Sequence, residues 1–152
     1  MMQKDRYIAF VCTGNTCRSP MAEAIFNRLS DEKGLGVGAV SFGMAAANGV
    51  PASFNAQKAC EEIGIDLSQK KASFIFNYDI AQFERFYCMS DEHAMMLRDF
   101  CGVPEEKIKV MNISDPFGGN LDVYRACRDE IYNSIKEIIK EYEDTENDPG
   151  TP

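Results

Sequence analysis

The 152-residue sequence has little of several features that mark large classes of protein. Lysine and arginine number 16 against 24 aspartate and glutamate, a net charge of −8, which excludes a broad basic footprint for DNA or RNA. The longest early apolar run, residues 7–12, is too short to cross a bilayer, so we expect no membrane association. Six cysteines are too few for a disulfide scaffold, which favours a cytoplasmic chain with reduced thiols.

Histidine is scarce as well. His93 is the only one and lies in a polar stretch that starts a helix, so we expect a solvated side chain. A cysteine protease would need it as the catalytic base, which makes that class a poor candidate. Only Cys12 and Cys17 have the spacing of metal ligands and no second pair follows, so we expect neither a metal nor another cofactor.

What the sequence does contain is an alternation of short apolar runs with amphipathic segments. Strands are predicted over residues 7–11, 39–42, 83–89 and 108–111. Helices are predicted from Pro20 to before Gly34, over 52–63, over 91–100 and from 121 onward. Because parallel strands need crossover helices, this order predicts an α/β fold with a three-layer, doubly wound parallel sheet. We expect one domain over residues 1–142, acting as a monomer, and a frayed acidic tail over residues 143–152.

The loop after the first predicted strand reads Cys-Thr-Gly-Asn-Thr-Cys-Arg-Ser over residues 12–19. A loop that closes onto a helix N-terminus aims several backbone N–H groups at one point, where they can surround a phosphate group. Arg18 adds a planar fork that matches two phosphate oxygens, Gly14 permits the sharp turn, and Asn15 can tie the loop down. The predicted phosphate-binding residues are Thr13, Gly14, Asn15, Thr16, Cys17, Arg18 and Ser19. Ser19 is also the expected N-cap of the helix, with Pro20 as its first residue.

Cys12 is the candidate nucleophile. A helix N-terminus and a neighbouring cation both favour the thiolate, so no separate base is required. Attack on phosphorus would give a thiophosphate intermediate, and the leaving group would then need a proton. Asp115, on a proline-stiffened turn before the last helix, is the candidate acid, and in the second step it would act as the base.

The other cysteines have less defined roles. Cys17 either packs behind the loop or forms a reversible disulfide with Cys12 that protects the nucleophile from further oxidation. Cys60, Cys88, Cys101 and Cys127 lie at apolar positions, for which core packing is the default.

Residues 11–24, which read Val-Cys-Thr-Gly-Asn-Thr-Cys-Arg-Ser-Pro-Met-Ala-Glu-Ala, and the Asp115-Pro116 pair resemble the low-molecular-weight protein tyrosine phosphatase family. The likeness extends over about residues 7–142. It implies a four-stranded sheet of flavodoxin-like topology and hydrolysis of phosphorylated proteins or peptides, with inorganic phosphate as product. It also implies that Cys12 is the nucleophile, Arg18 the phosphate clamp and Asp115 the acid and base. Ser19 would donate a hydrogen bond to the thiolate, and Asn15 would be anchored near Ser41.

The sequence departs from the family pattern in places that bear on the substrate. Thr16 stands where many tyrosine-specific members have a larger aliphatic residue, and Phe117 replaces a common tyrosine and is followed by glycines. Thr16 and Phe117 are both expected to line the wall of the substrate pocket. Thr16 together with the Asp-Pro-Phe-Gly-Gly segment is similar to the bacterial protein arginine phosphatases of the family. Phosphoarginine is therefore the alternative substrate to phosphotyrosine. Members often carry a histidine where Gln69 stands and an arginine near Ala72, so the network behind the loop is expected to differ here.

Two further classes are less well supported. Thiol-coupled arsenate reduction would need a disulfide relay, and Cys88 with Cys101 is the only plausible pair, although Cys88 is expected to be buried. A non-catalytic phosphate-binding module would leave the presence of both Cys12 and Asp115 unexplained.

Overall fold

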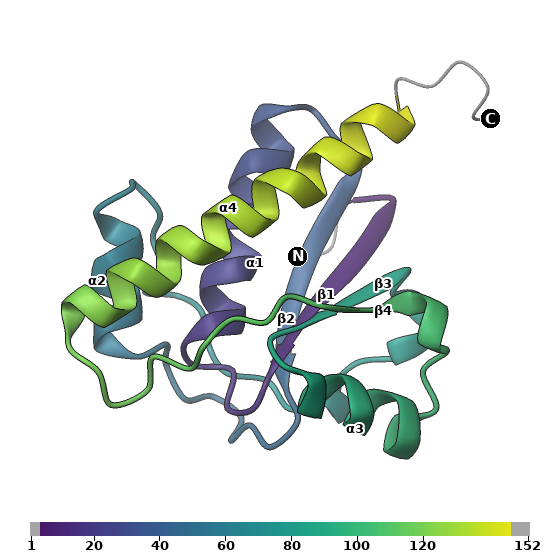
Figure 1. Ribbon diagram of the computed structural model, residues 1–152, viewed down its shortest axis with the longest axis horizontal. Coiled ribbons are helices and arrows are strands. Elements are labelled where there is room, and N and C mark those ends of the chain that lie inside the picture. The colour runs from purple at the N-terminus through teal and green to yellow at the C-terminus, as the bar shows by residue number, and fades with distance from the viewer. Residues whose placement is uncertain (1–3, 147–152) are drawn as a thin grey trace.

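The structure is a computed structural model that describes residues 4–146 (Figure 1). Strands and helices alternate along the chain. They are β1 (Arg6–Cys12), α1 (Arg18–Glu32), β2 (Val37–Gly43), α2 (Phe54–Glu61), β3 (Arg85–Cys88), α3 (Asp91–Cys101), β4 (Ile108–Val110) and α4 (Leu121–Glu146), with short 3-10 turns at Ile75–Asn77, Ile80–Gln82 and Glu105–Lys107. Every predicted strand and helix is present, and the boundaries differ by a few residues. No helix within these residues is both long and apolar enough to cross a membrane.

The four strands form one parallel sheet in the order β2-β1-β3-β4. This is the doubly wound sheet that the sequence pattern predicts, with the flavodoxin-like topology that the resemblance implies. The first connection leads from β1 to β2 on one side of it, and the next leads from β2 to β3 on the other side, so the carboxyl end of β1 lies at the switch point between β2 and β3. The loop that carries the candidate nucleophile therefore opens where such sheets bind their ligands.

The strand pleat divides the core into two apolar layers. Ile8 and Phe10 of β1 face the layer that is closed by α1, α2 and α4, which lie together on one side of the sheet (Figure 1). Ala9 and Val11 face the opposite layer, which contains residues of α3 and of the 3-10 turns. Burial on both faces explains why β1 is apolar along nearly its whole length.

Two predicted helix ends are corrected by the structure. The helix α1 begins at Arg18 with Cys17 as the capping residue, so Ser19 is not the N-cap, and Pro20 is the third helical residue, where a backbone N–H is still not needed. The expected tail is also shorter, because α4 runs to Glu146, well past residue 142. The rest of the predicted tail, residues 147–152, lies outside the described residues.

Candidate active site

The floor of the site is the sulfur of Cys12, at the carboxyl end of β1. Its side chain is buried, and its Sγ lies 2.8 Å from Oγ of Ser19 and 3.3 Å from the backbone nitrogen of Asn15. Both groups can donate a hydrogen bond to sulfur. Ser19 thus lies in the first turn of α1, and its hydroxyl contacts the candidate nucleophile.

Asn15 holds the loop in a strained conformation. Its φ is 57°, in the left-handed region that non-glycine residues seldom adopt, and Asn tolerates it better than most. The fully buried side chain compensates through three hydrogen bonds. Its Nδ2 donates to Ser19 Oγ at 2.8 Å and to Ser41 Oγ at 2.9 Å, while Oδ1 accepts from the backbone nitrogen of Ser73 at 2.9 Å. The contact with Ser41 that the resemblance implies is present.

A second row of side chains supports Ser41. Its hydroxyl donates to Glu23 Oε1 at 2.7 Å, and Nζ of Lys70 lies 3.2 Å from the same carboxylate oxygen and 3.3 Å from the carbonyl oxygen of Ser41. Gln69, in contrast, is exposed and contacts Ser68. Lys70 therefore supplies the cation in the altered network that the sequence comparison leads us to expect.

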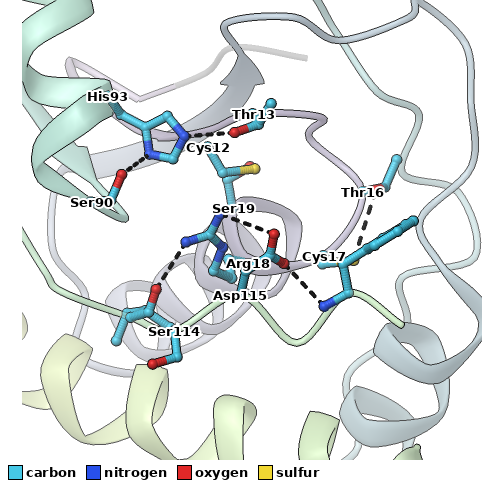
Figure 2. A network of polar contacts seen from close by, with 12 residues as sticks. Cys12, Thr13, Thr16, Cys17, Arg18, Ser19, Ser90, His93, Ser114 and Asp115 are labelled. Carbon is cyan, nitrogen blue, oxygen red and sulfur yellow. Dashed lines mark hydrogen bonds and ion pairs between the residues drawn. The ribbon is translucent and has the colours of Figure 1, made fainter. Parts of the chain in front are cut away.

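The candidate clamp and the candidate acid meet above the sulfur. Arg18, which is 7% exposed, donates from Nη1 to the carbonyl oxygen of Ile113 at 2.9 Å, and its Nη2 lies 3.7 Å from Oδ2 of Asp115 (Figure 2). The other oxygen of Asp115 accepts from the backbone nitrogen of Phe117 at 3.0 Å, which forms an Asx turn. Each oxygen of the carboxylate thus has its own neighbour, and the carboxylate is oriented toward Arg18.

These groups surround a pocket of about 270 Å³. Its walls are formed by Cys12, Thr13, Gly14, Thr16, Cys17, Arg18, Asp115 and Phe117. The structure brings together all of the sequence-predicted site residues, eight at the pocket surface and Asn15 and Ser19 beneath it. Phe117 is 79% exposed and stands at the mouth, and the backbone of Thr16 is fixed by a hydrogen bond from the nitrogen of Ser53 at 2.9 Å.

Cys17 lies on the side of the loop that faces α2 and α4. Its sulfur is 3.2 Å from the hydroxyl of Tyr124 and 3.5 Å from that of Ser53, and it is free. Burial and the neighbouring Cys17 raise the pKa of Tyr124 to about 12, so the phenol stays protonated and can donate to the sulfur.

The prediction for His93 is wrong. The side chain is 3% exposed rather than solvated, and its ring bridges two hydroxyls, with Nε2 2.8 Å from Thr13 Oγ1 and Nδ1 2.9 Å from Ser90 Oγ (Figure 2). The strand order, which the sequence pattern does not give, accounts for this position. Ser90 and His93 follow β3, and β3 is the parallel neighbour of β1, so both loops open at the same edge of the sheet.

The remaining cysteines do not form a second reactive centre. Burial raises the pKa of Cys60, Cys88 and Cys127 to about 12, which keeps these thiols protonated. Cys88, the expected first member of a relay, is fully buried. Among residues 4–146, no three His, Cys, Asp or Glu side chains are grouped so that they could hold a metal ion.

Comparisons with known proteins identify related sequences and structures. The family model described as "Low molecular weight phosphotyrosine protein phosphatase" matches residues 7–147. A protein-arginine-phosphatase of Geobacillus stearothermophilus is 36% identical over 144 residues, 88% of this chain and 93% of that protein. An arsenate reductase of Bacillus cereus is 33% identical over 91% of this chain and 98% of that protein. The solved structure of an arginine phosphatase mutant with a phosphorylated active-site serine superimposes with a TM-score of 0.86 at 30% identity, covering 90% of this chain and 95% of that one.

Proposed function

The chain belongs to the low molecular weight phosphotyrosine protein phosphatase family, and from that premise we propose that it hydrolyses phosphorylated protein side chains through a phosphorylated Cys12. One observation carries the proposal. The sulfur of Cys12 has two hydrogen-bond donors at the floor of a pocket whose upper wall holds Arg18 and Asp115.

In the first step the thiolate of Cys12 attacks phosphorus. A sulfur–phosphorus bond forms, the bond from phosphorus to the substrate oxygen breaks, and the protonated carboxyl of Asp115 gives its proton to that oxygen. Backbone N–H groups of the loop and the fork of Arg18 carry the charge of the phosphoryl oxygens. A chain with a net charge of −8 needs such a local cradle to hold a dianion.

In the second step water attacks the cysteinyl phosphate. The carboxylate of Asp115 accepts a proton from that water, the sulfur–phosphorus bond breaks, and Cys12 returns as a thiolate with inorganic phosphate as the product. The phosphorylated active-site serine of the related arginine phosphatase mutant supports an enzyme-bound phosphoryl group at this place in the fold.

Phosphotyrosine is the substrate we propose first, because the family model describes phosphotyrosine phosphatases. Phosphoarginine is a second candidate that Thr16 favours. A threonine leaves more room and more polarity at the pocket wall than a larger aliphatic residue, which suits a flexible guanidinium, and the relative at 36% identity is a protein-arginine-phosphatase. In that case the bond that breaks joins phosphorus to nitrogen, and Asp115 protonates that nitrogen.

Arsenate reduction is not supported by the thiols, despite the related arsenate reductase. A disulfide relay needs thiolates that can reach one another, and Cys88 is buried and protonated.

Catalysis by Cys12 requires a reduced sulfur, and all six cysteines are free. We therefore propose that the protein acts in the cytoplasm.

Two measurements test the proposal. Purified protein is expected to hydrolyse an aryl phosphate without added metal and to lose this activity in the Cys12→Ser variant, and activity that survived the substitution would overturn the mechanism. Rates on matched phosphotyrosine and phosphoarginine peptides then decide the substrate. Phosphotyrosine turnover equal to or higher than phosphoarginine turnover would exclude the second candidate.

A further inference from the structure

We propose that His93 is a positioning residue for the phosphate-binding loop, and that it acts by fixing the side chain of Thr13, the residue that follows the nucleophile. The inference rests on the proposed function of the loop. It adds a contact from α3 to the loop between β1 and α1.

The position of His93 is defined on both sides of its ring. Nε2 lies 2.8 Å from Thr13 Oγ1, and Nδ1 lies 2.9 Å from Ser90 Oγ (Figure 2). Ser90 precedes α3, where a serine hydroxyl commonly caps the helix, yet here the side chain makes no capping bond and its hydroxyl contacts the imidazole instead. Because His93 is only 3% exposed and its ring has a partner at each nitrogen, the imidazole has one well-defined orientation.

The charge state of the ring suits this role. Burial, and next the charge of Arg18, lower the pKa of His93, while Glu92 and Asp115 oppose the shift. A neutral imidazole has one N–H donor and one acceptor nitrogen, so it can donate to one hydroxyl and accept from the other. The ring therefore links Thr13 and Ser90 in either tautomer.

Thr13 is the point at which this contact reaches the site. The main chain of Thr13 is already held from the β2 side, because the backbone nitrogen of Ala45 donates to the carbonyl oxygen of Thr13 at 3.0 Å. The backbone nitrogen of Met44 likewise donates to the carbonyl oxygen of Cys12 at 3.0 Å. His93 holds the side chain of Thr13 from the side of α3. The first turn of the loop is thus fixed from both flanks, which keeps its N–H groups aimed at the phosphate before it binds.

The inference is tested by phosphate affinity. In a Cys12→Ser background, calorimetry gives the dissociation constant of inorganic phosphate without any need for turnover. Adding His93→Ala is expected to weaken binding roughly tenfold, the effect of losing one well-oriented hydrogen bond to the loop. His93→Gln is expected to recover part of the loss, because its amide nitrogen can reach the position of Nε2. His93→Asn is expected to recover none of the lost affinity, because its shorter side chain places the amide at the position of Nδ1 and cannot reach Thr13.

Thr13→Val provides the matching half of a double-mutant cycle. If His93 acts through Thr13, Thr13→Val weakens phosphate binding by a similar factor, and the double variant is no worse than either single one. Leu97→Ala, which removes a buried side chain from the same helix but no polar contact, serves as a control that lowers the melting temperature without changing phosphate affinity.

Three results would overturn the inference. These are unchanged phosphate affinity in His93→Ala, additive losses in the double variant, or loss of affinity in Leu97→Ala as large as in His93→Ala. Failure of the proposed function gives a different result, because it would appear as turnover that persists in Cys12→Ser whatever residue stands at position 93.

Discussion

Nη2 of Arg18 lies 3.7 Å from Oδ2 of Asp115, while Nη1 of the same guanidinium donates to the carbonyl oxygen of Ile113. The first helical residue of α1 thus contacts the segment before α4 at two points. The side chain of Asp115 is 56% exposed, so the ion pair itself contributes little to stability, about 1 kcal/mol or less. Its value is positional, since it places the candidate acid beside the group that receives the phosphate.

Replacing the acid tests that placement. Asp115→Asn keeps the shape and the Asx turn but has no proton to donate, so hydrolysis should slow by roughly 10²- to 10⁴-fold for alkyl or unactivated aryl phosphates. For p-nitrophenyl phosphate, whose leaving group is stable as an anion, the loss should be much smaller. Rates across a series of leaving groups give the comparison, and an equal loss for all of them would mean that Asp115 does not protonate the leaving group.

Thr16 should influence the choice of substrate. Thr16→Ile fills the pocket wall with an aliphatic side chain, which favours a flat phenyl ring over a guanidinium. The ratio of kcat/KM for a phosphoarginine peptide to that for a phosphotyrosine peptide should fall roughly 10- to 200-fold. Thr16→Ser, which keeps the hydroxyl and removes a methyl group, is the control and should leave the ratio within a few fold. A ratio that Thr16→Ile does not change would show that the wall has no part in selectivity.

Lys70 should stabilise the folded loop. Its side chain is only 14% exposed, and Lys70→Met removes the cation beside Glu23 and the donor to the carbonyl of Ser41. The free energy of unfolding should fall by about 1–3 kcal/mol, because a shielded carboxylate then has no cationic partner. Denaturant melts measure this change. The double variant with Glu23→Gln should recover part of the loss, and strictly additive losses would contradict a direct interaction between the two side chains.

The buried imidazole of His93 should make stability depend on pH. Its pKa is lowered in the folded protein, mainly by burial and then by Arg18, so the unfolded chain takes up a proton at higher pH than the folded one. The free energy of unfolding should therefore decrease as pH falls below about 6.5, the value for an unperturbed histidine, and level off below the folded pKa. In His93→Gln this component should be absent, so the difference between the two proteins as a function of pH isolates it. If the free energies of unfolding of the two proteins changed in parallel with pH, His93 would not be buried in the neutral form.

The sequence predicted most of the fold because its local signals agree. The apolar run of β1 stops at Gly14, and Gly102, with φ of 70°, ends α3 where expected. Most of the pocket residues were also predictable, since they are consecutive between the end of β1 and the start of α1, and the chemistry of cysteine and arginine at that spacing is specific.

What the sequence did not reveal depends on contacts between separate segments. The polar neighbours of His93 indicate a solvated residue, and only the pairing of β3 with β1 brings it against Thr13. Serine before a proline is a typical capping pattern, but the sulfur of Cys12 competes for the hydroxyl of Ser19. Lys70 in turn gains its role from Glu23, 47 positions earlier in the chain.

Trapping the phosphoenzyme tests the central claim most directly. The protein is mixed with a phosphorylated peptide, quenched in acid during steady-state turnover, digested and analysed by mass spectrometry. The account predicts one added phosphoryl group on the peptide that contains Cys12. In Asp115→Asn with an activated aryl phosphate as substrate, the amount of this phosphopeptide should be larger, because the substitution slows the attack of water more than it slows the first step. A phosphoryl group on another residue, or turnover in Cys12→Ser at the wild-type rate, would contradict it.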